Sequence, residues 1–506
     1  MRGPLDQPLM VVLLAIGGVS MAIPAGHAVV MGAHDLARTF FYSGLLVLVL
    51  TLLVAVALSG FRPANVARSH LLQLAGAYLL VPVALSLPVA LALPHLTLAQ
   101  AVFEMVSCLT GTGATLLDGA ATALSMHLWR ALVGWMGGFL TMLAAISILA
   151  PMNLGGFEVL TGQGAGRGAG GRLTGPKHGQ QSVQITRIAD PSSRMKRYAG
   201  QILPVYAGLT AALWLGLVLV GEPAAQGLIH AMSTLSASGI TALATGQPTA
   251  SGRMGEVLVL ICLVFALSRR TLPGSHARTT GPRLDRDPEL RTALVVILCF
   301  TAGLAAPRLM ATPDLASAGG ILWGSLFTTA SFLTTTGFVS ADWAGTAPGQ
   351  APPGFALLVL AMIGGGVATT AGGLRLIRLY VLYSHARHEL ERLVHPHSVG
   401  SSGRVARSLR QQGASVAWIF TMLFLMSIAL VMAALTVMGM GFEPALVLTI
   451  AALTGTGPLA GVGAATPILW ADQSDAAQII LMLTMVLGRL ETLPLIALLA
   501  PDSWRD

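Results

Sequence analysis

The stretch TTTGF, from Thr334 to Phe338, places three hydroxyl side chains and a glycine between two apolar segments, Ile321 to Phe332 and Phe355 to Ile363. Irregular polar backbone is tolerated at membrane depth only where protein buries it or where it lines a water-filled path. The stretch therefore predicts a loop that enters a membrane in the interior of the protein.

The same pattern occurs three more times in the chain. LTGTGATLLDG covers Leu109 to Gly119, LSASGITAL covers Leu235 to Leu243, and LTGTGPLAGVG covers Leu453 to Gly463. In every copy a small or hydroxyl residue precedes a glycine, and a long apolar segment follows. One such glycine alone is as readily a turn or a packing contact, but four copies indicate four quarters of one pore.

The composition is that of a polytopic membrane protein. Hydrophobic residues make up 54% of the 506 residues and charged residues only 10%, against about 25% charged residues in soluble domains. A spanning helix needs about 20 apolar residues, which leaves room for about ten spans. The three cysteines lie in apolar segments and show neither metal-ligand spacing nor a disulfide framework.

The apolar segments and the loops divide the chain into four units of helix, short helix, loop and helix. Two further helices precede the first unit, so the predicted fold is all-α, with four helix–pore-loop–helix repeats around one central pore. The predicted parts are the two N-terminal helices at 1–69, the first unit at 70–150, a basic glycine-rich connection at 151–197, the second unit at 198–270, a connection at 271–290, the third unit with a broken last helix at 291–383, a basic connection at 384–412 and the fourth unit at 413–506.

The distribution of charge predicts the topology. The connections that hold the four loops, at 94–127, 221–252, 312–354 and 439–474, contain acidic residues but no lysine or arginine. Basic residues mark cytoplasmic connections, so we expect the loops on the outer side and both termini in the cytoplasm. The net charge of +8 is then attributed to cytoplasmic connections and not to nucleic-acid binding.

The loops have the chemistry of an ion filter. A short helix that enters the membrane and returns as an extended loop can point its carbonyl groups at a central axis, and four such loops can replace the hydration shell of a monovalent cation. Glycine permits the backbone angles that this needs. The predicted filter residues are Gly111, Thr112, Gly113, Ala237, Ser238, Gly239, Thr335, Thr336, Gly337, Gly455, Thr456 and Gly457.

Two further features lie beneath the loops. Five glycines occur in the last helix of the third unit, and each weakens a helix by roughly 1 kcal/mol relative to alanine, so we expect the helix to break there. Close helix packing is the alternative explanation. Arg489 lies past the midpoint of the helix predicted from Ala476 to Leu499. A charge that deep usually faces a bundle interior or an aqueous cavity, although its side chain could instead reach the inner membrane surface. The residues of the two features are Gly364, Gly365, Gly366, Gly372, Gly373 and Arg489.

Two carboxylates are candidates for the outer mouth of the pore. Asp118 and Asp342 each lie five residues beyond a filter glycine, in the first and third units. Together they would concentrate cations at the entrance, an effect that added salt weakens. Helix capping or simple exposure to solvent is an equal alternative for both.

These motifs resemble the Trk/Ktr/HKT superfamily of potassium transporters, and most closely its bacterial TrkH-type membrane subunits. FEMVSCLTGTGAT (Phe103 to Thr115) and FTTASFLTTTGF (Phe327 to Phe338) resemble the first and third filter segments of that family. IGGGVATTAGGLRLIR (Ile363 to Arg378) and LGRLE (Leu487 to Glu491) are also characteristic. The chain departs from the pattern at Ile240, where an aromatic residue is expected, and at Leu459, where the family often has glycine.

The resemblance implies channel-like potassium uptake across the bacterial inner membrane, with K⁺ bound at the filter residues. It further implies an intramembrane gating loop from Gly364 through Gly373, an electrostatic barrier at Arg489, a homodimer and a cytoplasmic nucleotide-binding subunit of the TrkA type. No organic cofactor is expected.

Two rival functions remain open at this point. The nearer rival is a K⁺ symporter coupled to H⁺ or Na⁺, although the membrane segments hold few carboxylates that could relay protons. A polytopic membrane enzyme is the more distant one. Its best candidate groups, the histidines of the third basic connection, are more simply interpreted as part of a solvated docking face. These histidines are His385, His388, His395 and His397.

Overall fold

The computed structural model describes residues 8–58, 66–119, 121–150, 191–243, 249–268, 270, 287–311, 315–343, 354–394 and 404–491. Within these ranges the protein is built from helices and has no strand, which confirms the predicted all-α class. Most of the connections predicted at 151–197 and 271–290 lie outside the described residues, as do His395 and His397.

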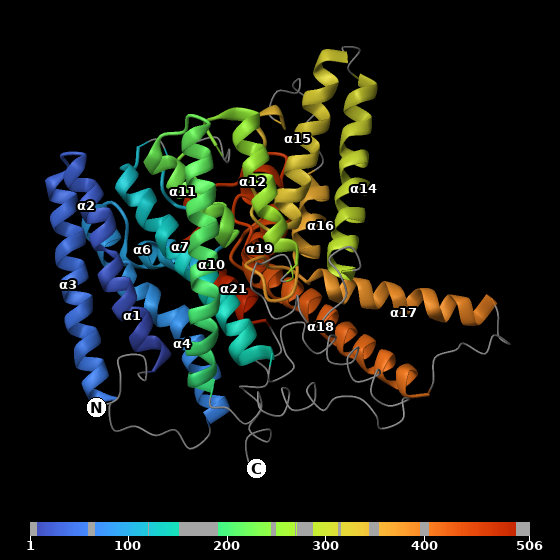
Figure 1. Cartoon of the computed structure of the whole chain (residues 1–506), viewed down its shortest axis with the longest axis horizontal. Helices are drawn as coiled ribbons and strands as arrows, with labels where there is room; N and C mark the ends of the chain where they lie inside the picture. The colour runs from blue at the N-terminus through green and yellow to red at the C-terminus, as the bar shows by residue number, and fades with distance from the viewer. Residues whose placement is uncertain are drawn as a thin grey trace.

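The N-terminal helices pack together at one end of the molecule, where Figure 1 shows them in dark blue beside the first unit. The first span is kinked at Met21, between its two helices, so that α1 and α2 act as one span of 22 residues. The elements of this part are α1 (Leu9–Ser20), α2 (Ala22–Val30), α3 (His34–Ala57), α4 (Val66–Leu85), α5 (Leu87–Ala92), α6 (Leu98–Leu109), α7 (Leu124–Ala144) and the π-helix η2 (Ala145–Leu149).

The remaining three units repeat the order of α4 to α7, with a short helix before each loop. In the third unit the last helix is interrupted, and its second half, α17, leaves the bundle at a steep angle (Figure 1). The elements are α10 (Pro191–Leu219), α11 (Ala224–Ser236), α12 (Gly252–Leu267), α14 (Pro288–Ala311), α15 (Leu315–Leu333), η6 (Ala341–Trp343), α16 (Gly354–Ile363), α17 (Leu376–Val394), α18 (Arg404–Val437), α19 (Phe442–Thr454), α20 (Leu459–Val462), η7 (Trp470–Asp472) and α21 (Asp475–Leu490).

Seven stretches of helix among the described residues are long and apolar enough to cross a membrane, against the ten spans predicted. The other three predicted spans correspond to shorter helices. The α12 helix has 16 residues, α16 has 10 before the glycine-rich break, and α21 has 16 within the described residues. At 1.5 Å per residue, a helix of 16 residues falls short of the roughly 30 Å of a hydrocarbon core.

The interior of the molecule surrounds the loops, while the outer helices keep apolar faces uncovered by protein. Phe103, Phe327 and Phe338, which flank the first and third loops, are fully buried. By contrast, Leu219 and Met310 at the ends of α10 and α14 are more than four-fifths exposed. This distribution is expected for helices that face lipid on one side and a polar interior on the other.

Candidate functional site

The four short helices α6, α11, α15 and α19 all end in the same backbone motif. The N–H of the middle filter residue donates to the carbonyl five residues earlier, the outer hydrogen bond of a Schellman ending. The donor–acceptor pairs are Thr112 to Ser107 at 2.8 Å, Ser238 to Ser233 at 3.0 Å, Thr336 to Ser331 at 3.0 Å and Thr456 to Ala451 at 2.8 Å.

Such an ending places one residue of each loop in the left-handed region of backbone space. The φ angles are 64° at Gly111, 52° at Ala237, 58° at Thr335 and 71° at Gly455. Left-handed backbone costs a residue with a side chain roughly 1–2 kcal/mol, and it is especially unfavourable for a β-branched one. The second and third loops therefore keep this conformation at a cost that the surrounding packing must offset.

A pair of hydroxyl groups lies behind each loop. A hydroxyl residue at the end of the short helix, either its last residue or the next one, bonds to the middle filter residue, at 2.9 Å in the first and second units and at 3.1 Å in the third and fourth. Only the second hydroxyl of each pair belongs to the predicted filter residues. The spacing Ser/Thr-x-Ser/Thr-Gly, present in all four loops, was the signal that could have found the first. The missed residues are Thr110, Ser236, Thr334 and Thr454.

The structure brings all four predicted loops together at one point. A side-chain carbon added at Gly113 would overlap the carbonyl oxygen of Ser238, and one at Gly239 would overlap that of Thr336. In turn, the Gly457 N–H donates to the Thr112 carbonyl at 2.6 Å. The glycines are required because the backbones of neighbouring loops touch.

The fourth loop differs from the other three in its backbone. The third residue of the motif is left-handed at Gly113, Gly239 and Gly337, with φ of 72°, 65° and 81°, whereas Gly457 does not have a positive φ. Pro458 follows it and restricts the backbone of the preceding residue. The proline ring packs against Gly337, within 3.2 Å of the position of an added side-chain carbon.

The arrangement of the short helices favours a cation at their meeting point. All four present their C-terminal ends to the loops, as the endings described above require. The C-terminus of a helix carries a partial negative charge of about half an elementary charge. Four converging C-termini, together with the buried hydroxyl groups, therefore favour a cation between the loops.

The glycine-rich segment of the third unit lies directly beneath the loops. The helix breaks where the glycines predict it, because α16 ends at Ile363 and α17 begins at Leu376. The intervening segment, 364–375, contains the glycines for which the family resemblance implies a gating role, and it is called the gate loop below. Its Gly372 N–H donates to the Thr335 hydroxyl of the third filter loop at 2.8 Å, and its Val367 N–H donates to Glu289 at 2.9 Å.

Arg489 links the first filter loop to the gate loop. Its guanidinium donates to the Thr370 carbonyl at 2.7 Å, to the Gly111 carbonyl at 3.2 Å and to the Thr110 carbonyl. The side chain is 9% exposed and faces the interior beneath the filter. The alternative prediction, in which the Arg489 side chain extends to the inner membrane surface, is therefore wrong.

Glu491 is not the partner of Arg489. Its carboxylate pairs with Arg378 at 2.7 Å and with Arg375 at 3.5 Å. Arg375 also donates to the carbonyl groups of Gly366 and Ala371 inside the gate loop. These two arginines thus fasten the lower side of the gate loop to the end of α21.

The two outer-mouth candidates have different surroundings. Asp118 is exposed in the segment after the first loop. Asp342 pairs with Arg253 at 2.6 Å, and that arginine is the first residue after the connection at 221–252. Arg253 offsets the charge expected of Asp342, and it was not among the residues predicted for the outer mouth.

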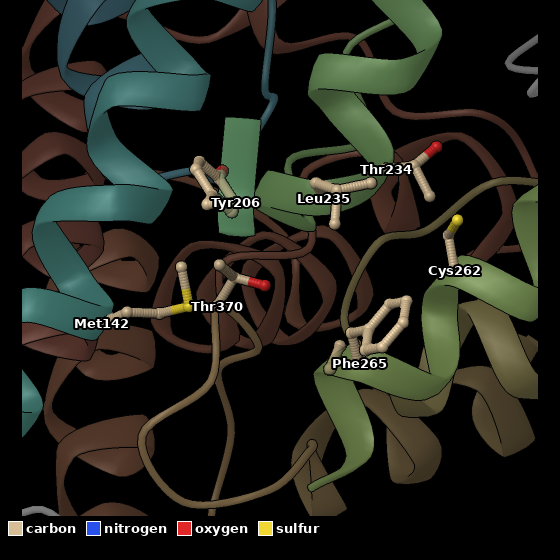
Figure 2. Close-up of a pocket in the computed structure, with 8 residues that line it drawn as sticks. Met142, Tyr206, Thr234, Leu235, Cys262, Phe265 and Thr370 are labelled. Atoms are coloured by element: carbon tan, nitrogen blue, oxygen red, sulfur yellow. The ribbon is translucent and has the colours of Figure 1, made fainter. Parts of the chain in front are cut away.

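A small pocket lies beside the gate loop, between α7, α10, α11 and α12. Figure 2 shows Thr370 of the gate loop facing the same space as Phe265 and Cys262 of α12. Met142, Tyr206, Thr234, Leu235 and Ala266 complete the lining. Largely apolar side chains therefore border the gate loop on the side of this pocket.

The fold and the four converging loops define a polytopic helical membrane protein built from repeated helix–loop–helix units. The family model for TrkH, described as a cation transport protein, matches residues 313–505. The chain is 29% identical to the Trk system potassium uptake protein TrkH of Salmonella typhimurium, over 82% of this chain and 81% of that one. It is 28% identical to TrkI of Halomonas elongata, over 83% and 81% of the two chains.

A solved structure has the same fold. The crystal structure of the potassium transporter TrkH from Vibrio parahaemolyticus superposes with a TM-score of 0.76 and 23% identity, and the match covers both chains in full. Together, these comparisons confirm the predicted resemblance to the TrkH-type membrane subunits.

Proposed function

We propose that this chain is the membrane subunit of a potassium uptake system and that K⁺ crosses it in a channel-like manner. The observation that carries the proposal is the meeting of four loops with one common ending, Ser/Thr-x-Ser/Thr-Gly, at the C-termini of four short helices. The relatives described above are named as potassium uptake proteins. None of them is named as an enzyme, so the enzyme alternative has no support from these relatives.

In this proposal carbonyl groups near the four filter glycines, within the twelve predicted filter residues, coordinate dehydrated K⁺. A ring of carbonyl oxygens can replace the hydration shell of a monovalent cation. The hydroxyl pairs hold the loops from behind, and the helix C-termini supply the negative potential. K⁺ is the transported ion, and no organic cofactor is involved.

The gate loop and Arg489 form the barrier beneath the filter. The loop places backbone under the third filter segment, where the Gly372 N–H reaches Thr335. A fixed positive charge in a narrow passage of low dielectric repels a cation far more strongly than the same charge in water. Opening would require both the loop and the arginine to move aside.

Regulation is assigned to partners. The proposal includes a homodimer in the bacterial cytoplasmic membrane, with both termini inside, and a cytoplasmic nucleotide-binding subunit of the TrkA type. The positive-inside rule supports this orientation. The basic connections on the cytoplasmic side, including the histidines at 385 and 388, would offer the docking face.

Ion flux into liposomes from purified protein, with K⁺, Rb⁺ and Na⁺ compared, tests this function. We expect Gly337→Ser to lower the K⁺-to-Na⁺ flux ratio, because φ is 81° at this position and a side chain there is strained and presses on the Pro458 ring. The protein should still insert, since the added carbon meets this ring and not the backbone of another loop. Gly113→Ser should be more damaging, since its side chain would overlap the Ser238 carbonyl. An unchanged ratio in Gly337→Ser would remove this glycine from the filter.

The same assay separates a channel from a coupled symporter. A symporter would move H⁺ or Na⁺ with K⁺ in a fixed ratio, and K⁺ flux would stop without the coupling ion. A channel-like subunit passes K⁺ down its own gradient whether or not a gradient of the second ion is present.

A further inference from the structure

Polar side chains on three of the short helices form hydrogen bonds with the chain just beyond the filter glycine. The position nine residues before that glycine is Glu104 in the first unit, His230 in the second and Thr328 in the third. All three are fully buried and hydrogen bond to residues two or three positions after the glycine. In the fourth unit the same position is Leu448, which has no polar group to offer.

In the first unit the side chain that forms these hydrogen bonds, Glu104, belongs to a buried ion pair. The Glu104 carboxylate accepts hydrogen bonds from the Thr115 hydroxyl and from the Leu116 N–H, both at 2.9 Å. Arg130 of α7 pairs with the same carboxylate at 2.5 Å, and neither side chain is more than 2% exposed. The Thr115 hydroxyl in turn accepts from the Leu117 N–H at 3.0 Å. The segment after the filter is thus held by side chains and not by regular backbone bonding.

The second unit repeats the arrangement with different residues. His230 Nε2 bonds to the Thr241 hydroxyl at 3.1 Å, and its Nδ1 pairs with the fully buried Glu222. Thr241 follows its filter glycine by two residues, as Thr115 does, and accepts from the Leu243 N–H at 3.0 Å. A carboxylate again stands behind the loop, here acting through a histidine.

In the third unit the carboxylate comes from the preceding unit. Glu256 of α12 accepts from the Ala341 N–H at 2.8 Å, from the Ser340 hydroxyl at 2.8 Å and from the Trp323 indole at 2.6 Å. Thr328 adds a weaker bond from the Ser340 N–H at 3.4 Å. Glu256 is 1% exposed.

We propose that these three carboxylate clamps, Glu104–Arg130, Glu222–His230 and Glu256, are positioning groups that set the ion selectivity of the filter. The inference rests on the proposed function of the loops as a K⁺ filter. A hydrogen bond to an ionised group is roughly twice as strong as a neutral one, so the clamps fix the outer half of each loop firmly. Since neighbouring loops touch, a shift in one loop changes the spacing of the whole carbonyl ring.

Isosteric substitution of the carboxylates tests the proposal by the ratio of K⁺ to Na⁺ flux in liposomes. Glu104→Gln and Glu256→Gln should each lower this ratio by about tenfold, the change expected if one buried charged hydrogen bond acts fully on selectivity. Glu443→Gln is the matched control. This exposed carboxylate bonds to the Ala465 N–H at 2.9 Å, eight residues beyond Gly457, and its substitution should leave the ratio unchanged.

Removing the loop side of the first two clamps guards against misfolding, because it leaves no buried charge unpaired. Thr115→Val and Thr241→Val should lower the ratio, whereas Thr122→Val, whose hydroxyl bonds only to the Asp118 carbonyl, should not. Arg130→Lys keeps a positive charge beside Glu104 and should retain most of the selectivity that Arg130→Met loses.

A merely structural role predicts a different result. Yield and the fluxes of both ions would then fall together, and an unchanged ratio in all clamp variants would overturn the inference. Gly337→Ser, measured in the same assay, distinguishes a failure of the filter assignment from a failure of the clamp inference. If it lowers the ratio and the clamp variants do not, only this inference fails. If it too leaves the ratio unchanged, the filter assignment itself is wrong.

Discussion

At the scale of single residues, Thr335 combines two features that no other filter residue shares. It is a β-branched residue in left-handed backbone, with φ of 58°, and its hydroxyl accepts the hydrogen bond from Gly372 of the gate loop. A residue keeps such an unfavourable backbone conformation only where the surrounding contacts hold it there. The bond to Gly372 joins the third filter loop directly to the segment that would have to move.

We therefore expect Thr335→Val to raise ion flux in the absence of any partner, because it keeps the shape of the side chain but removes the bond to the gate loop. One neutral hydrogen bond contributes about 1 kcal/mol, so the rise should be about fivefold. Thr335→Ser keeps the hydroxyl and should conduct like the parent. Flux per reconstituted protein is the measurement. Equal flux in the two variants would show that this bond does not hold the gate.

At the scale of elements, the gate loop is a stretch of backbone held between three helices and the filter. Its Gly366 N–H donates to the Ala266 carbonyl at the end of α12, Glu289 of α14 holds Val367, and Arg489 of α21 holds Thr370. Its glycines allow close contact with neighbouring backbone in addition to the broken helix. An added side-chain carbon at Gly372 would overlap the Thr454 carbonyl. Close packing and a broken helix, the two explanations of the glycine run, therefore both apply.

Removing the barrier should raise partner-free flux. Deletion of several residues between Gly364 and Gly373 takes backbone out of the path. Arg489→Gln removes the charge but keeps a donor for the carbonyl groups of Thr110 and Thr370. Unit charges 4 Å apart interact by about 4 kcal/mol at an effective dielectric constant of 20, so loss of the charge should raise flux by more than about tenfold.

Arg489→Ala serves as the comparison for the gate, since it removes the donors as well as the charge. It should also conduct faster than the parent, but with a lower yield of folded protein. If neither the deletion nor the arginine variants conduct faster per reconstituted protein, the barrier to ions lies elsewhere in the molecule.

At the scale of the whole molecule, charge at the outer end is shared between units. Asp118 of the first unit is exposed, and Asp342 of the third unit is paired with Arg253, which lies in the first turn of the last helix of the second unit. The pair is partly exposed, so its contribution to stability is small. Its effect on the local potential is larger, because it offsets one of the two charges that would attract cations.

K⁺ uptake at low ionic strength should fall in the double variant Asp118→Asn, Asp342→Asn and rise in Arg253→Gln, which frees the charge of Asp342. Attraction between exposed charges is modest, so we expect changes of about two- to threefold. They should vanish near 1 M salt, where the Debye length is about 3 Å. Asp472→Asn, at another exposed outer position, is the control. If K⁺ uptake at low salt is unchanged both in the double variant and in Arg253→Gln, these carboxylates do not concentrate cations at the entrance.

Features that depend on local composition could be predicted from the amino-acid sequence. The apolar segments, the four recurring loops and the break between Ile363 and Leu376 could all be predicted, because hydrophobicity and glycine content act over a few residues. The number of long spans could not, since α12 and α16 are short helices inside apolar stretches.

The contacts between groups that lie far apart in the sequence depend on the packing of the helices. Glu256 belongs to the second unit but supports the third loop, and Glu491 pairs with Arg378, 113 residues away, and not with its neighbour Arg489. The left-handed backbone of Thr335 likewise contradicts its local preference. Such contacts depend on how the helices pack, and a buried charge finds the partner that packing brings to it, because leaving it unpaired would cost far more than any local preference.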